Sequence, residues 1–354
     1  MSKSYEFLQK LGISSPIIQA PMAGISNSEL AAAVSNCGGL GSLGLGAASA
    51  ETARSMIQKT RALTTKPFNL NFFCNRTPLR DPVKESAWLD RISPMFSEYD
   101  AERPSELKKI YESFLSNKPM FDVLVEEKCP VISFHFGLPD RDQISILKAQ
   151  GSTLLASVTN LSEALQAQDA GMDAVIAQGW EAGGHRGCFD ENAPDDEYGV
   201  FPLTHLLVKK LQIPVIAAGG IMDGEGISAA LGLGAIAAQL GTAFVACDES
   251  NANDEYLAAL NGEGAYHTVM TRVISGRPAR CVLNKVSRWG QTVANEVVPD
   301  YPIAYHAGKA LNAAATAKGN YGFAAHWAGQ GAPLTRAMPA ERLMETLKSE
   351  IKDT

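Results

Sequence analysis

Short apolar runs recur along the chain, and each is followed by an alanine-rich or amphipathic stretch of helical length. Strands that helices cover on both faces are apolar at nearly every position, so the runs predict buried strands of a parallel sheet. Eight strand-then-helix units are expected in sequence. The strands are predicted at residues 16–20, 40–44, 67–73, 130–137, 153–158, 173–177, 213–218 and 235–240.

Eight successive units of this kind predict an α/β fold, a (β/α)8 TIM barrel. A doubly wound open sheet is the competing architecture. In such a sheet, however, the glycine-rich ends of the last two strands would not act together as they do in a barrel. The whole chain, 1–354, is expected to form one domain. A charged, proline-containing insertion interrupts the pattern at about 75–118, with a helix expected at 105–115 and a possible use as a lid. A helical extension is expected at about 250–354.

The composition indicates a compact soluble enzyme, with 19% charged and 45% hydrophobic residues. The net charge of −7 and the lack of a lysine/arginine block argue against nucleic acid as a partner. Six cysteines without C-x-x-C spacing suggest neither a metal site nor a disulfide framework. No apolar run approaches the roughly 20 residues of a membrane span, and the first eleven residues lack the core of a signal peptide. We therefore expect a cytoplasmic location.

A glycine-rich loop, residues 177–187, follows the sixth predicted strand and contains His185. Four glycines in eleven residues are costly to order, which a chain tolerates mainly where its backbone needs positive φ or lies against a ligand. The loop leaves the carboxyl end of a strand, where barrels bind their ligands. His185 could instead be a structural imidazole that closes a turn. We interpret it as a site residue because of its glycine context.

The ends of the last two strands, residues 218–220 and 239–242, have the features of a phosphate site. In barrels these loops present backbone N–H groups to a phosphate, and glycine allows close approach. Glycines that merely pack helices are the alternative. The amides of Asn71 and Gln178 at other strand ends suit the mixed donors and acceptors of a flavin ring. His135, at the end of the fourth strand, is equally consistent with a substrate contact and with a hydrogen-bonded core histidine.

Taken together, these segments resemble the nitronate monooxygenases of class I, formerly called 2-nitropropane dioxygenases. The resemblance extends over about residues 14–247 and continues at 321–330. It is carried by Gln19-Ala20-Pro21-Met22-Ala23-Gly24, Asn36-Cys37-Gly38-Gly39-Leu40-Gly41, Asn69-Leu70-Asn71-Phe72, the loop 178–187, Ala218-Gly219-Gly220-Ile221 and Gln239-Leu240-Gly241-Thr242.

The resemblance implies a TIM barrel that binds FMN and detoxifies alkyl nitronates such as propionate 3-nitronate, using dioxygen and giving a carbonyl compound and nitrite. It implies that His185 is the catalytic residue, as base on a neutral nitroalkane or as polar partner of a nitronate, with His135 on the substrate side. A monomer or homodimer is expected. The implied FMN contacts are Ala20, Pro21, Met22, Asn71, Gln178, Gly183, Gly219, Gly220, Gln239, Leu240, Gly241 and Thr242.

Two other functions share these features. The same glycine-histidine loop occurs in flavin-dependent enoyl-acyl-carrier-protein reductases and in NADH:quinone reductases. A barrel that binds a phosphorylated ligand without redox chemistry is the third possibility. The insertion at 75–118 and the extended carboxyl tail favour the nitronate branch.

Overall fold

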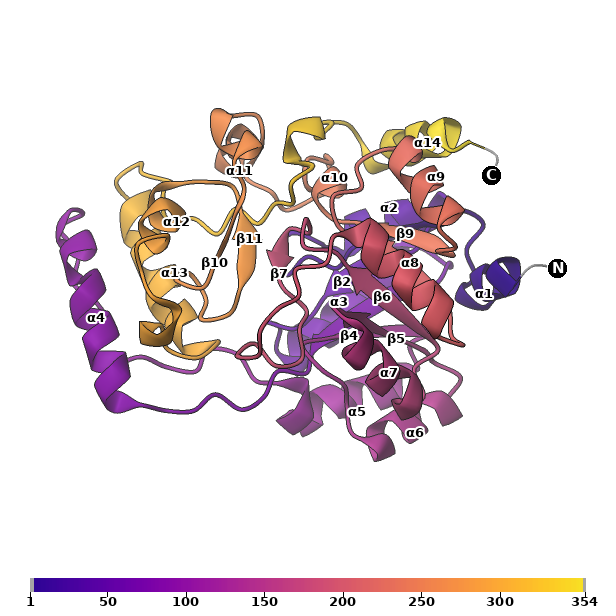
Figure 1. The fold of residues 1–354 in the computed structure, drawn as a ribbon, viewed down its shortest axis with the longest axis horizontal. Coiled ribbons are helices and arrows are strands. Elements are labelled where there is room, and N and C mark those ends of the chain that lie inside the picture. Colours follow the sequence, from indigo (N-terminus) through magenta and orange to yellow (C-terminus); the bar gives the residue numbers. More distant parts are fainter. Residues whose placement is uncertain (1–2, 353–354) are drawn as a thin grey trace.

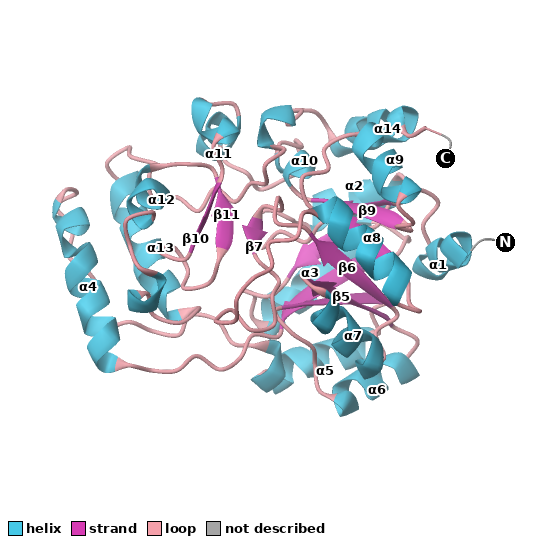
Figure 2. Cartoon of the chain, in the orientation of Figure 1, coloured by secondary structure: helices cyan, strands magenta, loops and turns pink. Residues whose placement is uncertain are grey.

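Eight parallel strands surrounded by helices form the larger part of the molecule in the computed structural model, which describes residues 3–352 (Figures 1 and 2). Each strand lies close to a predicted apolar run. The barrel strands are β1 (Ile17–Gln19), β2 (Gly41–Gly44), β3 (Phe68–Phe73), β4 (Val131–His135), β5 (Thr153–Val158), β6 (Ala174–Gln178), β8 (Val215–Ala218) and β9 (Ala237–Leu240).

The sheet closes into a barrel because its two ends meet. The strand order runs from β1 through β9, β8, β6, β5, β4 and β3 to β2, with every neighbouring pair parallel. An isolated parallel bridge joins Ile18 to Leu40, and the N–H of Gln19 donates to the Leu40 carbonyl at 2.9 Å. The predicted TIM barrel is therefore confirmed, and the open-sheet alternative is excluded.

Helices cover the outside of the barrel, and a helix at the start of the chain closes its amino-terminal end, where Phe7 and Leu11 pack against the interior side chains. None of the helices in the described range 3–352 is long and apolar enough to cross a membrane. These helices are α1 (Lys3–Leu11), α2 (Ser28–Asn36), α3 (Ala50–Leu63), α5 (Lys118–Glu127), α6 (Arg141–Ala149), α7 (Leu161–Ala170), α8 (Val200–Lys210), α9 (Gly224–Gly232), α10 (Thr242–Val245) and α14 (Ala340–Glu350).

The helix α2 is capped by a residue other than the one that its local sequence spacing indicates. The spacing of Ser26 and Glu29 predicts a capping box, but the side chain of Asn27 caps the helix by accepting from the N–H of Leu30. The Ser26 hydroxyl instead accepts from the N–H of Met22 at 2.9 Å. Ser26 therefore stabilises the loop after β1 rather than the helix.

A second unit, here called the cap, stands beside the carboxyl ends of the barrel strands (Figure 1). Only helices were expected in this region, yet the cap contains a three-stranded antiparallel sheet in the order β10, β11, β7. The third strand, β7, comes from the glycine-histidine loop of the barrel. The cap elements are α11 (Asp254–Leu260), β10 (Val269–Thr271), β11 (Ala279–Cys281), α12 (Lys285–Gly290) and α13 (Ile303–Thr316), with β7 at Gly184–His185.

The insertion forms its helix earlier than predicted. The expected helix at 105–115 is wrong: that stretch is irregular apart from a 3-10 turn at Phe114–Ser116, and the helix is α4 (Pro82–Ser97). Trp88 and Ile92 of α4 pack with Ile303 of α13 in one apolar cluster. Figure 1 shows α4 at the outer edge of the cap, far from the barrel.

Candidate functional site

A cavity of about 550 Å³ opens at the carboxyl ends of the barrel strands, between the barrel and the cap. This volume is within the range of small-molecule sites. Leu240 does not line it, because its side chain is buried among the helices outside the barrel. The other predicted site residues do line it: Ala20, Pro21, Met22, Asn71, His135, Gln178, Gly183, His185, Gly219, Gly220, Gln239, Gly241 and Thr242.

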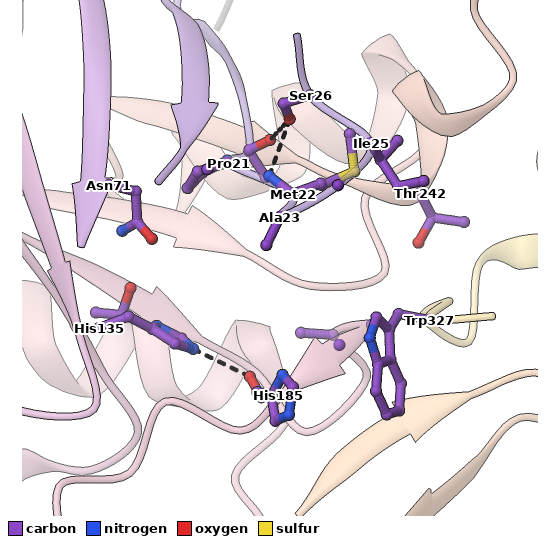
Figure 3. Close-up of a pocket in the computed structure, with 18 of the residues that line it drawn as sticks. Pro21, Met22, Ala23, Ile25, Ser26, Asn71, His135, His185, Thr242 and Trp327 are labelled. Carbon is purple, nitrogen blue, oxygen red and sulfur yellow. Dashed lines mark hydrogen bonds between the residues drawn. The ribbon is translucent and has the colours of Figure 1, made fainter. Parts of the chain in front are cut away.

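The cavity has two facing walls. Figure 3 shows Pro21, Met22 and Ala23 on one side, with His185 and Trp327 across from them. The first wall is the loop after β1, which the Ser26 hydroxyl stabilises. The second wall is the glycine-histidine loop together with the carboxyl tail. The space between the walls suits a flat group with a reacting partner on the His185 side.

The loop after β8 lines the cavity with two glycines, so that its backbone faces the cavity without side chains. Gly219 has φ of 125° and Gly220 has φ of 68°, values that side-chain-bearing residues rarely adopt. A Cβ on Gly220 would lie 3.2 Å from the Cβ of Glu181. Among the described residues, the Gly220 N–H has no acceptor. This loop can therefore present an N–H group to a ligand anion.

The three amide side chains predicted for the site, those of Asn71, Gln178 and Gln239, differ in how many of their polar atoms are already hydrogen-bonded. Gln178 is committed to the histidine loop: its Oε1 accepts from the N–H of Gly187 at 2.7 Å, and its Nε2 donates to the His185 carbonyl at 3.0 Å. Asn71 donates its Nδ2 to the Ser133 hydroxyl at 2.9 Å. The Oε1 of Gln239 is buried and has no partner among residues 3–352. Gln239 therefore has a buried acceptor that no described residue satisfies.

His185 is fixed by tertiary contacts rather than by its own loop. It lies in β7, where the cap strand β11 pairs with it. Its Nε2 lies 2.9 Å from the Ser275 hydroxyl. The rings of Trp327 and Tyr301 surround the imidazole, with centroids 5.1 and 5.4 Å away. The ring is thus held at one edge, with aromatic groups around it.

Burial keeps both cavity histidines neutral. Burial, with smaller contributions from the nearby His135 and Arg277, lowers the pKa of His185 to about 3. Burial also lowers the pKa of His135 to about 4. The Nε2 of His135 lies 3.1 Å from the His185 carbonyl oxygen (Figure 3). Since a carbonyl oxygen only accepts, His135 donates there and braces the loop that carries His185.

A group of aromatic and cationic residues at the mouth of the cavity was missed at the sequence level. Lys309 is exposed, and its Nζ lies 5.3 Å from the ring centroids of both Tyr111 and Tyr305. Within residues 3–352, Lys309 forms no ion pair. Tyr305 and Lys309 are four residues apart in α13, so they share one helical face, and Tyr301 lies just before the start of this helix. That spacing indicates from the sequence that Tyr305 and Lys309 lie together, although it does not show that their face points to the cavity.

Tyr111 contributes to this group from the insertion. No other described residue of 75–118 lines the cavity. The ring centroid of Tyr111 lies 6.0 Å from that of Tyr305, and the two rings meet edge to face. The insertion therefore reaches the site through Tyr111, while α4 packs on the cap. A lid function of the insertion stays a prediction.

Buried ion pairs hold the loops around the site. Arg277 of the cap and Glu191 of the loop after β6 form a pair at 2.9 Å, with side chains 0% and 5% exposed. Arg76 contacts Glu191 at 3.1 Å and Asp300 of the cap at 3.1 Å. The stretch 190–198 has the acidic, irregular sequence of a solvated loop, but its Glu191 is buried and binds two arginines. These pairs link barrel and cap next to the cavity.

Comparison with known proteins identifies the family. The family model described as nitronate monooxygenase matches residues 5–350. The chain is 56% identical to the nitronate monooxygenase of Paraburkholderia phytofirmans, covering 98% of this chain and 95% of that one. It is 50% identical to that of Pseudomonas aeruginosa, covering 98% and 99%. A solved structure of nitroalkane oxidase from Streptomyces ansochromogenes has a TM-score of 0.89 at 38% identity, covering 97% of both chains. The chain therefore belongs to the nitronate monooxygenase family of oxidoreductases.

Proposed function

We propose that the enzyme binds FMN and uses dioxygen to oxidise alkyl nitronates such as propionate 3-nitronate to a carbonyl compound and nitrite, as a detoxification reaction in the cytoplasm. The observation that supports an anionic substrate is Lys309, a cation without an acidic partner among the described residues. It stands at the mouth of a cavity that contains the neutral His185. A small anionic substrate matches this arrangement in charge and size.

The residues at the cavity fit FMN. The Gly219–Gly220 turn leaves no side chain where a phosphate would approach, and the Gly220 N–H is free to donate. A Cβ on Gly241 would meet nothing closer than 3.5 Å, so the second loop is also open. The unpartnered Oε1 of Gln239 could accept from a ring or ribityl donor. Bound FMN would supply the oxidation chemistry that this side-chain set lacks.

The chain's own contribution to nitronate oxidation is orientation and charge balance. The nitronate is already a carbanion equivalent, so no proton has to be removed. Lys309 and the hydroxyl groups of Tyr111 and Tyr305 can attract its negative groups. Trp327 and Tyr301 narrow the space beside His185 and exclude water. These residues hold the reacting carbon on the His185 side of the cavity.

A neutral nitroalkane makes a different demand, because its α-proton must leave before oxidation. We assign this step to His185, which is neutral and lines the cavity. Replacing His185 with Asn should lower turnover of the nitroalkane by about 100-fold or more, and turnover of the preformed nitronate far less. Oxygen uptake measured with nitroethane and with ethyl nitronate tests this assignment. Equal losses on the two substrates would reject it.

The redox partner is tested on the purified protein under anaerobic conditions. One sample receives propionate 3-nitronate, and another receives NADH or NADPH. Bleaching of the flavin absorbance by the nitronate alone supports the proposed function. Rapid bleaching by the nicotinamide alone would assign the protein to the reductases, and a colourless protein without flavin would favour a barrel that binds a phosphorylated ligand.

A further inference from the structure

The Ser275 hydroxyl is the direct partner of His185, yet the proposed function gives it no part. Ser275 is fully buried between β10 and β11. Its Oγ lies 2.9 Å from the Nε2 of His185, 3.2 Å from the carbonyl oxygen of Arg277 and 3.4 Å from the backbone nitrogen of Arg277. Three polar neighbours thus surround a group that has one proton to donate.

The position of that proton follows from the needs of the neighbours. A serine hydroxyl donates once and can accept twice. If Ser275 donates to the Arg277 carbonyl, its oxygen accepts from the Arg277 N–H and from the Nε2–H of His185, and all three contacts are satisfied. If Ser275 donates to His185, the Arg277 carbonyl loses its donor, since no other described group donates to it. Buried carbonyl groups are almost always paired, so the first arrangement is favoured.

We propose that Ser275 is a positioning residue that holds His185 as the Nε2–H tautomer and leaves its Nδ1 as the unprotonated nitrogen at the cavity. The consequence for catalysis rests on the proposed function, in which His185 is the base. Nδ1 has no hydrogen-bond partner in the described part of the chain. It is also not one of the unpaired side-chain atoms that the protein encloses completely. The ring lies at the cavity surface opposite Met22 and Ala23 (Figure 3).

The tautomer decides what His185 can do. With a neutral nitroalkane, the Cα–H bond breaks and the proton forms an N–H bond at Nδ1. The electron pair of the broken bond becomes the C=N π bond of the nitronate, while the π pair of the nitro N=O bond moves onto its oxygen, which takes the negative charge. The product pair is an imidazolium beside a nitronate anion, so charge is balanced within the site.

The same tautomer cannot donate to a nitronate, because the only N–H of the ring points to Ser275. The negative charge of a preformed nitronate must therefore be met by other groups, of which Lys309 is the cation at the cavity. Ser275 thus separates two tasks: His185 accepts protons, and the Lys309 group attracts anions. Loss of Ser275 should damage the first task and spare the second.

The tautomer can be read directly by ¹⁵N NMR of the holoenzyme with labelled histidine. Protonated and unprotonated ring nitrogens have well-separated shifts, and the His185→Asn variant identifies the His185 signals. The expected result is a proton on Nε2 in the wild type and a shift of population toward Nδ1–H in Ser275→Ala. A wild-type proton on Nδ1, or an unchanged tautomer in Ser275→Ala, would overturn the inference.

Kinetics provide the second readout. Ser275→Ala should lower kcat/KM for nitroethane by about 10- to 100-fold and change that for ethyl nitronate by no more than about twofold. Ser275→Thr keeps the hydroxyl and should recover much of the loss. Ser287→Ala is the matched control, since Ser287 is equally buried in the cap and serves the start of α12. An equal loss with both substrates would reject the positioning function.

The two proposals can fail separately. If the protein oxidises no nitronate, the proposed function is wrong, yet the NMR result still decides whether Ser275 sets the tautomer. If nitronate is oxidised and the tautomer does not depend on Ser275, only the further inference is wrong.

Discussion

Lys309→Met should weaken binding of substrates with a second negative charge. Propionate 3-nitronate carries a carboxylate in addition to its nitronate, whereas propyl-1-nitronate has the same carbon chain without the carboxylate. The Lys309 Nζ lies at the cavity mouth, between the rings of Tyr111 and Tyr305. The variant keeps an unbranched side chain that is one atom shorter and removes its charge. The difference between the two substrates therefore isolates the interaction with the carboxylate.

The magnitude follows from the exposure of Lys309. Two unit charges about 4 Å apart attract by about 1 kcal/mol in water and by about 4 kcal/mol at an effective dielectric constant near 20. Lys309 is exposed, so the lower part of this range applies, at about 1 to 1.5 kcal/mol. KM for propionate 3-nitronate should rise about 5- to 13-fold, with kcat nearly unchanged. KM for propyl-1-nitronate should rise less.

Initial rates of oxygen uptake, measured for both nitronates at low and high salt, test this prediction. The wild-type preference for propionate 3-nitronate should fall as salt screens the charge, and the Lys309→Met preference should not respond. Lys318→Met is the control: Lys318 is also exposed, but it pairs with Asp100 and does not line the cavity. Equal effects of Lys309→Met on both substrates would refute the reasoning.

Three further predictions concern the cofactor site, the fold and pH. Gly220→Val should release FMN, because valine would strain the positive φ and would keep the phosphate away from the backbone N–H. The ratio of flavin to protein absorbance measures the loss. Gly232→Ala is the control: a Cβ at Gly232 would lie in open space, so this variant should retain the flavin. Arg277→Met should lower the free energy of unfolding in urea by about 3 to 5 kcal/mol, because it leaves Glu191 buried without its partner. The double variant Arg277→Met, Glu191→Met should recover part of this loss. If the losses of the two single variants simply add in the double variant, the two residues do not stabilise the protein as a pair. Burial lowers the pKa of His185 to about 3, so the unfolded chain binds this proton more readily, and stability should fall as pH drops from 6.5 toward 3. Between pH 7 and 5, Tm should fall less in His185→Asn than in the wild type.

Much of the barrel could be predicted because its signals are local. Each strand is a short buried apolar run, and the glycines after β8 and β9 mark places where backbone must lie bare. The insertion helix was misplaced because its stability comes from packing. Residues 105–115 have polar spacing that suits a helix, but Trp88 and Ile92 find apolar partners on α13, and so the helix forms there.

The cap and the mouth of the cavity could not be predicted in the same way. Ala279, Arg280 and Cys281 form a strand only because β7 and β10 lie beside them. Lys309 and Tyr305 lie on one helical face, but nothing in the sequence shows that this face points to the cavity. Likewise, Glu191 belongs to an acidic stretch whose sequence resembles that of a solvent-exposed loop. Arg277 and Arg76 come close to Glu191 only when the chain folds.

The sequence by itself determined the eight strand-and-helix units, the glycine-rich loops at their carboxyl ends and the position of His185 in one of them. These features depend on neighbours within a few residues, through apolar periodicity and the backbone freedom of glycine. The tertiary structure decided which atoms of His185 are available. Ser275, about ninety residues away in the sequence, lies at its Nε2 at 2.9 Å. Such a contact requires the pairing of β7 with β11, which brings distant parts of the chain together only when the cap packs against the barrel.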